Sequence, residues 1–392
     1  MNLPLSRLLF GFSDSAVGEG AFGQHGPFRP TMRGLVKNPY SWNKAANLLY
    51  LDSPAGVGFS YSTNLSDYLL VTDEMAARDH LVFLQHWFNK FPEFKTNEFF
   101  IAGQGYAGHF APQLAQLILE TKSEINLKGI AIGNPLLDYD NDYNSTADFL
   151  WSHAQISDLT YWKLKNKCGY ASITKEYITE KSTKACQDTN TKMSIEVNGY
   201  TNSFNVYANT CPAAPENEEY LQQTGEKAYV CTRDATNAYM DKQETLKALH
   251  ASLVGIQKWS ICSKVLYYNP YEQFNPTINL LGTLVRSGVR ILVFSGDSDS
   301  VIPFMGTRSL IREMAEDFGF RTTRDYQAWF QDGQVAGWSQ VFEDILTYAT
   351  ILGEGHSDGV SQPKNSLLML KTFLEGKPLP ERHPFPKNGH KN

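Results

Sequence analysis

The sequence predicts an α/β fold with a mainly parallel central sheet flanked by helices. Strand and helix patterns alternate in the first part of the chain, which is typical of parallel strands joined by helical crossovers. Strand patterns fade between about residues 148 and 265, where the cysteines lie, and return at residue 289. We therefore expect two parts of one core, 1–147 and 266–392, around a helical, disulfide-bearing cap insertion at 148–265.

The expected elements follow in chain order. Short apolar runs predict buried strands at 47–51, 98–102, 127–132, 289–294 and 348–352. Apolar residues at helical spacing, with Pro or Gly at several ends, predict helices at 73–91, 112–121, 157–167, 244–252, 306–318 and 365–374. The tail after Pro378 is polar and rich in Pro, and we expect it to be loose.

Composition excludes several classes of partner. Of the 392 residues, 42% are hydrophobic and 19% are charged, which is ordinary for a globular protein. The net charge of −6 provides neither the basic surface that binds nucleic acid nor a polybasic surface for anionic lipid. No apolar run approaches the roughly 18 residues that span a bilayer. We expect no nucleic-acid and no membrane partner.

The cysteines and two sequons indicate in which cellular compartment the protein folds. Clustering of the cysteines in a polar stretch favours disulfides and a secretory history, although five thiols in a cytosolic protein remain the alternative. The five are Cys168, Cys186, Cys211, Cys231 and Cys262. Asn64 and Asn144 each begin an N-glycosylation triplet. The apolar patch at 8–10 is too short for a signal peptide, and none is visible.

A strand, a tight turn and a helix are expected around residues 103–108, which read Gly-Gln-Gly-Tyr-Ala-Gly. This is the pattern of the nucleophile elbow of α/β-hydrolases, G-x-S-x-G, with Gly105 at the position of the Ser. An elbow Ser tolerates strained backbone angles at a cost of about 1–3 kcal/mol, whereas Gly adopts them without strain. A Gly here should therefore preserve the fold while removing the attacking oxygen.

Two further residues complete the order of a hydrolytic triad. Asp299 follows the strand expected at 289–294, and His356 lies in a Gly-flanked loop after the strand at 348–352. Polar residues at the carboxyl ends of parallel strands are placed where such sheets carry their sites. Taken alone, Asp299 is equally well interpreted as a loop cap, and a loop His such as His356 is more often simply exposed. The order of nucleophile position, Asp and His is far more specific.

Other chemistries find little support. The sequence lacks H-E-x-x-H spacing, paired C-x-x-C motifs, a phosphate loop with Lys and a dinucleotide fingerprint. We expect neither a metal nor a cofactor. Ser13, Ser53 and Ser60 do not sit at a strand-to-helix elbow, so we do not expect them to replace the nucleophile.

Several motifs resemble the serine carboxypeptidases of peptidase family S10, particularly the plant serine carboxypeptidase-like proteins. They are Asn-Pro-Tyr-Ser-Trp-Asn-Lys at 38–44, Asp-Ser-Pro-Ala-Gly-Val-Gly-Phe-Ser-Tyr-Ser at 52–62, the turn at 103–108 with His109, Ser-Gly-Asp-Ser-Asp-Ser-Val-Ile-Pro at 295–303 and Phe-Leu-Glu-Gly-Lys-Pro-Leu-Pro at 373–380. The resemblance implies an α/β-hydrolase fold and a secreted or vacuolar enzyme. Such enzymes release C-terminal residues from peptides, usually at acidic pH, or transfer acyl groups from acyl-glucose donors.

The resemblance also implies a role for particular positions. Gly105 replaces the nucleophilic Ser, while Asp299 and His356 match the acid and base. Gln104 replaces the Glu that helps to bind a substrate carboxylate, and Asp52 replaces the Glu of a Glu-Ser-Pro-Ala-Gly motif; both are expected to bind substrate. Tyr106 and Gly11 match the oxyanion positions, and Leu9 stands where the family has a carboxylate-binding Asn.

The same comparison implies the disulfide pairing. Asp14 replaces a family Cys, which leaves Cys262 without its family partner and leaves the pairs Cys168–Cys186 and Cys211–Cys231. It also implies that a signal peptide and N-terminal edge strands are missing from this chain.

Three functional hypotheses follow. The first is an inactive serine carboxypeptidase homologue, because triad activity depends on every member. The second is a binding protein that uses the old acyl pocket to hold a peptide or an acyl-glucoside-like ligand. The third is weak residual hydrolysis or acyl transfer, with His356 activating water directly. The sequence indicates neither the ligand nor the oligomeric state.

Overall fold

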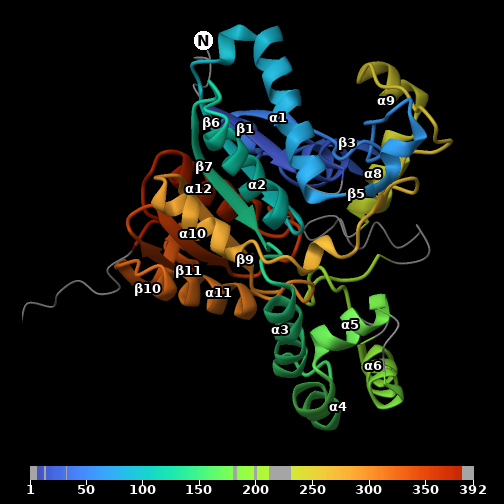
Figure 1. Cartoon of the computed structure of the whole chain (residues 1–392), viewed down its shortest axis with the longest axis vertical. Helices are drawn as coiled ribbons and strands as arrows, with labels where there is room; N and C mark the ends of the chain where they lie inside the picture. Colours follow the sequence, from blue (N-terminus) through green and yellow to red (C-terminus); the bar gives the residue numbers. More distant parts are fainter. Residues whose placement is uncertain are drawn as a thin grey trace, which may run out of the picture.

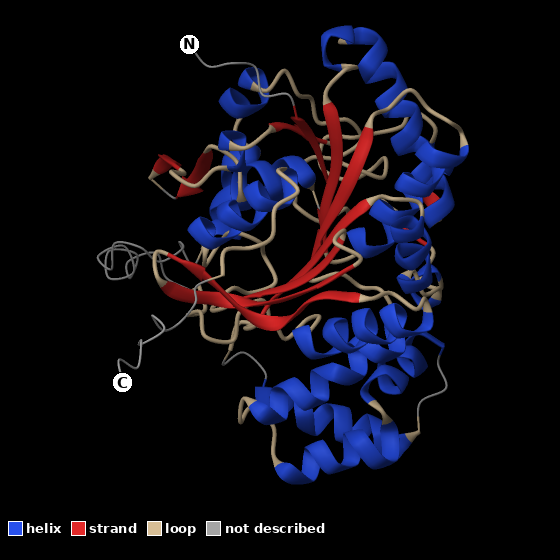
Figure 2. Ribbon diagram, turned by 90° about the vertical axis from the view of Figure 1, so that its left-hand side faces the viewer, coloured by secondary structure: helices blue, strands red, loops and turns tan. Residues whose placement is uncertain are grey.

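The fold is built on one large twisted sheet with helices on both sides (Figure 1, Figure 2). The computed structural model describes residues 7–12, 15–31, 33–179, 183–197, 201–211 and 231–381. The strands of the large sheet are β1 (Arg7–Phe12), β4 (Asn47–Tyr50), β6 (Glu98–Gln104), β7 (Leu127–Gly133), β9 (Arg290–Gly296), β10 (Thr322–Gln331), β11 (Gln334–Phe342) and β12 (Leu346–Ile351).

The sheet is mainly parallel, as expected. Its strand order is β10-β11-β12-β9-β7-β6-β1-β4, and only the pairs β10–β11 and β11–β12 are antiparallel. All parallel strands therefore end at the same edge. This register brings the carboxyl ends of β6, β9 and β12, which precede Gly105, Asp299 and His356, to one side of the sheet.

Helices cover both faces because the central strands are apolar on both sides. Helices α1 (Asp73–Lys90), α2 (Ala107–Glu120), α10 (Ile278–Arg286) and α11 (Phe304–Asp317) pack on one face and share a core with Phe99 and Ile101 of β6. Helix α12 (Pro363–Leu374) packs on the other, against Phe100. Successive side chains of β6 therefore point to opposite faces of the sheet and contribute to two hydrophobic cores.

Helix α2 begins earlier than the sequence predicts. It starts at Ala107 rather than at Pro112, which lies inside the helix. Pro112 has no backbone N–H to bond the carbonyl of Gly108. The hydroxyl of Thr277 donates a hydrogen bond to that carbonyl at 2.8 Å instead. A distant residue therefore allows Pro inside the helix, and the turn at 105 leads directly into α2.

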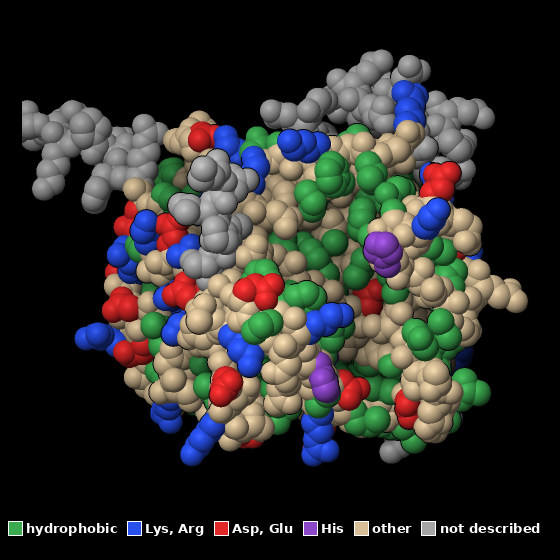
Figure 3. Space-filling view, turned by 90° about the horizontal axis from the view of Figure 1, so that it is seen from above, with side chains coloured by type: hydrophobic (Ala, Val, Ile, Leu, Met, Phe, Trp, Pro, Cys, Tyr) green, Lys and Arg blue, Asp and Glu red, His purple; other side chains and the backbone are tan. Residues whose placement is uncertain are grey.

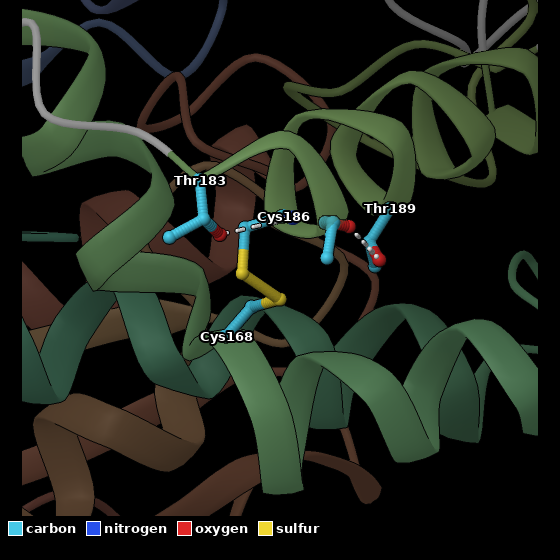
Figure 4. Close-up of a disulfide and its surroundings, with 5 residues drawn as sticks. Cys168, Thr183, Cys186 and Thr189 are labelled. Atoms are coloured by element: carbon cyan, nitrogen blue, oxygen red, sulfur yellow. Dashed lines mark hydrogen bonds between the residues drawn. A yellow bond between two sulfur atoms is a disulfide. The ribbon is translucent and has the colours of Figure 1, made fainter.

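The insertion occupies two places. Helices α4 (Asp158–Lys163), α5 (Tyr170–Thr179) and α6 (Lys184–Val197) gather with α3 (Tyr139–Ser152) beyond one end of the sheet (Figure 2). The predicted helix at 157–167 divides into α4 and a π-helical turn, η5 (Leu164–Cys168). The disulfide Cys168–Cys186 joins η5 to α6 (Figure 4).

The later part of the insertion lies elsewhere, beside the start of the chain. Helices α8 (Thr232–Met240) and α9 (Gln243–Ala248) follow the second disulfide, Cys211–Cys231. The ring of Tyr239 in α8 lies 5.5 Å from that of Phe22 in η1 (Ala16–Gln24). The remaining short elements are β2 (Phe28–Thr31), β3 (Gly34–Lys37), β5 (Leu69–Val71), β8 (Tyr267–Tyr268), η2 (Trp42–Lys44), η3 (Leu65–Tyr68), η4 (Pro92–Phe94) and η7 (Glu272–Phe274).

Surface charge and helix hydrophobicity are the features relevant to nucleic-acid and membrane partners. In the face that Figure 3 shows, Lys and Arg alternate with Asp and Glu, and hydrophobic side chains gather toward the middle. Over the residues that the structure describes, no helix has the length and apolar character needed to cross a membrane.

Candidate active site at the carboxyl end of the sheet

The turn between β6 and α2 is as tight as the sequence predicts. Gly105 has a φ of +60°, in the left-handed backbone region that residues other than Gly adopt only with strain. Its N–H donates to the carbonyl of Gly133 at 3.0 Å, and its carbonyl accepts from the N–H of Leu136 at 3.0 Å. The adjoining strand β7 and the loop after it therefore hold this turn on both sides.

His356 and Asp299 form a close pair beside this turn. Nδ1 of His356 lies 2.8 Å from Oδ2 of Asp299, which is wholly buried. The Asp299 carboxylate also accepts the backbone N–H of Val301 at 2.7 Å and of Ile302 at 3.3 Å. In a neutral imidazole, an Nδ1–H that donates to this carboxylate leaves Nε2 as an acceptor. The pair can therefore take up a proton at Nε2.

The base faces residue 105 directly. A Cβ atom at Gly105 would lie 3.2 Å from Nε2 of His356 and 3.6 Å from its Cε1; apart from Gly105 and its chain neighbours, no other heavy atom of the described residues lies within 4 Å. A side chain at this position thus points at the nitrogen that accepts a proton. The structure brings Gly105, Asp299 and His356 together, although they are separated by up to 251 residues (356 − 105).

A cavity of about 620 Å³ opens over these residues. Its walls come from the turn, from the loop that carries His356 and from the insertion. The larger apolar side chains that line it are Val57, Phe110, Phe204, Ile261, Leu266, Val301 and Val360. Charged and polar side chains include Glu19, Gln104 and Arg233. A mainly apolar cavity with a few polar groups is typical of a small-ligand site.

Three other predicted site residues have different placements. Gln104 and Tyr106 line the cavity. Asp52 does not line the cavity. Its carboxylate points inward and accepts hydrogen bonds from the hydroxyl of Ser15 at 2.7 Å and from the N–H groups of Val17 at 3.0 Å and Phe59 at 2.9 Å. Burial raises the pKa of Asp52, which those hydrogen bonds oppose. In this position Asp52 holds the start of η1.

The oxyanion position Gly11 lies in β1, level with Ala102 of β6, two residues before Gln104. Ser13 and Asp14 lie outside the described residues. Cys262 belongs to neither disulfide, and its sulfur accepts a hydrogen bond from the Arg233 guanidinium at 3.1 Å.

Sequence reasoning missed a buried carboxylate behind the turn. Asp73 accepts hydrogen bonds from the hydroxyls of Tyr106 (3.0 Å) and Tyr268 (2.5 Å) and lies 2.8 Å from Nδ1 of His109. Burial alone would raise the pKa of Asp73, but the contacts with His109, Tyr268 and Gln113 together lower it. The network fixes Tyr106 at the start of α2. Its members come from three distant segments, so no local motif signals it.

Sequence reasoning also missed the anchor of the His356 loop. Glu354 is wholly buried, and its two oxygens accept four backbone N–H groups, from Gly355, Gly359, Ser361 and Gln362, at 2.9–3.2 Å. Burial raises the pKa of Glu354 to about 7, with those hydrogen bonds opposing it. Asp358 is also buried, and burial together with the nearby Glu354 raises its pKa well above the usual range.

These raised pKa values predict a pH dependence of stability. A carboxyl whose folded pKa is raised keeps its proton in the folded state, so its stabilising contribution is lost as pH rises through that value. We expect Asp358→Asn, which cannot ionise, to become more stable relative to the native chain between pH 5 and pH 8, by about 1 kcal/mol or more. The measurement is urea unfolding of both proteins across this range. Asp325→Asn, on the exposed edge strand β10, should follow the native curve; a constant difference for Asp358→Asn would contradict the prediction.

The sheet order, the tight turn after β6 and the His–Asp pair together define an α/β-hydrolase. A crystal structure of Kex1(delta)p, a prohormone-processing carboxypeptidase from Saccharomyces cerevisiae, has this fold. It aligns with a TM-score of 0.75 at 19% identity, covering 96% of this chain and 84% of that one.

Sequence comparison identifies the family. The serine carboxypeptidase family profile matches residues 13–376. Serine carboxypeptidase-like 45 and serine carboxypeptidase-like 46 of Arabidopsis thaliana are each 44% identical to the chain, over 373 and 375 residues, with 94% of this chain and 81% of each relative covered. The chain belongs to the serine carboxypeptidase family, which confirms the family and fold that the sequence predicts.

Proposed function

We propose that this chain is a serine carboxypeptidase homologue that no longer forms an acyl-enzyme and that its cavity binds a peptide or a small acylated ligand. The observation that carries the proposal is the position of Gly105 beside Nε2 of His356. A Cβ at residue 105 would lie 3.2 Å from this nitrogen, yet Gly has no side-chain oxygen that could attack a substrate. A nucleophile and its base are the core of covalent hydrolysis, and here only the base remains.

The preserved surroundings support a binding role. The His356–Asp299 pair keeps its 2.8 Å contact, and a cavity of about 620 Å³ remains beside it. Hydrolysis of a blocked dipeptide at acidic pH, measured for the native chain and for Gly105→Ser, tests the proposal. We expect no turnover in the first and turnover in the second.

A second candidate function is weak hydrolysis without a covalent intermediate. The intact His356–Asp299 pair favours it, because a histidine whose Nδ1 is held by a carboxylate can act as a general base toward water. Turnover in the native chain that His356→Ala abolishes would establish this function and overturn the first proposal.

We also propose that the chain matures in an oxidising compartment, in the secretory route or the vacuole. Two disulfides support this, since such bonds persist outside reducing compartments.

Of the two sequons, geometry favours Asn64 for glycosylation. Asn64 is exposed at the start of η3, whereas Asn144 lies inside α3, where its amide oxygen accepts the N–H of Ala171 at 3.1 Å. On expression through a eukaryotic secretory route, we expect Asn64→Gln to remove the mass of one N-glycan and Asn144→Gln to leave the mass of the glycosylated protein unchanged. Intact-mass spectrometry before and after endoglycosidase treatment measures this; a glycan lost only with Asn144→Gln would contradict it.

A further inference from the structure

We propose that an N-glycan attached to Asn64 covers an exposed apolar surface beside it, so that this surface is the docking site of the chain's own carbohydrate. The inference rests on the glycosylation of Asn64 proposed above and goes beyond it by giving the glycan a position and a role. We call this surface the leucine patch. Its members are Tyr61, Leu65, Leu69, Leu70 and Tyr267.

Every member of the leucine patch is more than half exposed. The exposed fractions are 51% for Tyr61, 78% for Leu65, 60% for Leu69, 61% for Leu70 and 55% for Tyr267. None of the five lines the cavity. Single exposed apolar residues are common, but a contiguous group of them marks a surface that another molecule covers or through which the protein associates. The leucine patch therefore calls for an occupant.

Two segments far apart in the sequence make the patch continuous. β5 pairs in parallel with β8, and Leu69 lies opposite Tyr267 in this register. Leu65 begins η3, which ends directly before Leu69. The segment before η3 contains the first member of the patch. It is held in place by Tyr68, whose hydroxyl donates to the carbonyl of Ser62 at 2.9 Å and accepts its N–H at 2.8 Å.

Asn64 lies within the patch and directly precedes its most exposed member, Leu65. As the N-cap of η3, it accepts the N–H of Ser66 at Oδ1, at 3.2 Å. Its Nδ2 donates to Oδ1 of Asp67 at 3.2 Å, which uses one of the two N–H bonds of the amide. Attachment forms a bond from Nδ2 to the anomeric carbon of the sugar, breaks the bond from that carbon to the pyrophosphate of a lipid-linked donor, and releases one amide proton. The first sugar is thereby placed at the patch.

A tethered sugar needs only weak contacts to occupy this surface. Because the glycan is linked to Asn64, its contact with the patch is intramolecular, at an effective concentration on the order of millimolar. Pyranose rings present C–H faces that pack on Tyr rings and Leu side chains, while their hydroxyls remain in water. Burial of the apolar surface stabilises this contact, and the outward hydroxyls keep the covered face soluble.

The charges around the patch disfavour two other occupants. Burial and the nearby charge of Asp67 raise the pKa of Asp79, which shows that these two carboxyl groups lie close together. Among the cations close in sequence to the patch, Arg78 is paired with Glu74, and Lys264 offsets a single carboxylate. An acidic edge repels anionic lipid. A second copy across a twofold axis would bring the same carboxylates to both sides of the contact.

The test compares Ser66→Ala with Ser66→Thr in the full chain, expressed through a eukaryotic secretory route. Both keep the Asn64 amide, but only Thr preserves the glycosylation triplet. We expect Ser66→Ala to enhance the fluorescence of anilinonaphthalene sulfonate about threefold and to self-associate in sedimentation velocity, because the patch is uncovered. Ser66→Thr should match the native glycoprotein in both measurements. Intact-mass spectrometry establishes which protein carries the glycan.

A second set of variants removes the patch itself. In the Ser66→Ala background, Leu65→Ser together with Leu69→Ser should return dye fluorescence and sedimentation to the native values. Ile195→Ser, the same change at an exposed position of α6, should leave both raised in that background. Thermal unfolding of each variant verifies that it is folded.

Unchanged dye fluorescence and sedimentation in Ser66→Ala, or an increase that the two Leu substitutions leave in place, would overturn the inference. Association of the native glycoprotein with itself or with phosphatidylcholine vesicles, abolished by Leu65→Ser with Leu69→Ser, would also overturn it, because the patch would then have another occupant. A native chain without a glycan on Asn64 overturns the proposed glycosylation as well. A glycan that does not change the exposure of the patch overturns only its covering role.

Discussion

Replacing Gly105 with Ser is expected to convert a protein without detectable hydrolysis of blocked dipeptides into one with measurable turnover. A Cβ at this position lies 3.2 Å from Nε2 of His356, and Oγ, one bond further, can rotate to within hydrogen-bonding reach. Because triad activity depends so strongly on its nucleophile, we expect kcat/KM to rise at least about 10³-fold above any background. The assay is release of the C-terminal residue at acidic pH.

Gly105→Ala is the matched control for this experiment. It introduces the same Cβ, the same close approach to His356 and the same strain at a φ of +60°, but no hydroxyl. Both variants should lose about 1–3 kcal/mol of unfolding free energy, and only the Ser variant should turn over substrate. A folded Ser variant without activity would mean that the oxyanion region around Gly11 and Tyr106 is also incompetent. Activity in the Ala variant would show that hydrolysis does not use residue 105.

In the Gly105→Ser background, adding Asp299→Asn is expected to lower kcat by about 10³–10⁴-fold. Asp299 accepts the Nδ1–H of His356 at 2.8 Å and so favours the tautomer in which Nε2 is the proton acceptor. An Asn amide can donate to Nδ1 instead, which would favour the tautomer with the proton on Nε2. The base would then face the new Ser with a proton already in place.

The control for this variant is Asp325→Asn, the same substitution at an exposed position of β10, the edge strand two places from β12. It should leave kcat within a factor of two, in line with the small effect of surface substitutions. KM should change little in either variant, because Asp299 is buried behind His356 and does not line the cavity. Retention of full kcat in the Asp299→Asn protein would contradict a positioning role for this carboxylate.

The sequence predicted five strands of the large sheet and missed three. The run at 98–102 is apolar because β6 is buried on both faces, and such a pattern is visible locally. Strand β10 forms the edge of the sheet and is mostly half-buried, and in β11 beside it exposed residues interrupt the buried ones. Neither strand therefore carries the continuous apolar run that signals a buried strand. The apolar patch at 8–10 is the middle of β1, which pairs between β4 and β6. Its neighbours in space are what make it a strand.

The sequence by itself determined the family, the strand-turn-helix around Gly105 and the order of Gly105, Asp299 and His356, because short local motifs encode each of these features. Only the tertiary structure decided which side chains meet. It turned Asp52 away from the cavity, placed Gln24 next to Gln104 and Glu19 next to Ser357, and set Glu354 beneath the His356 loop. Those contacts join residues up to 338 positions apart. They depend on strand order and on the direction of each side chain, which no local pattern encodes.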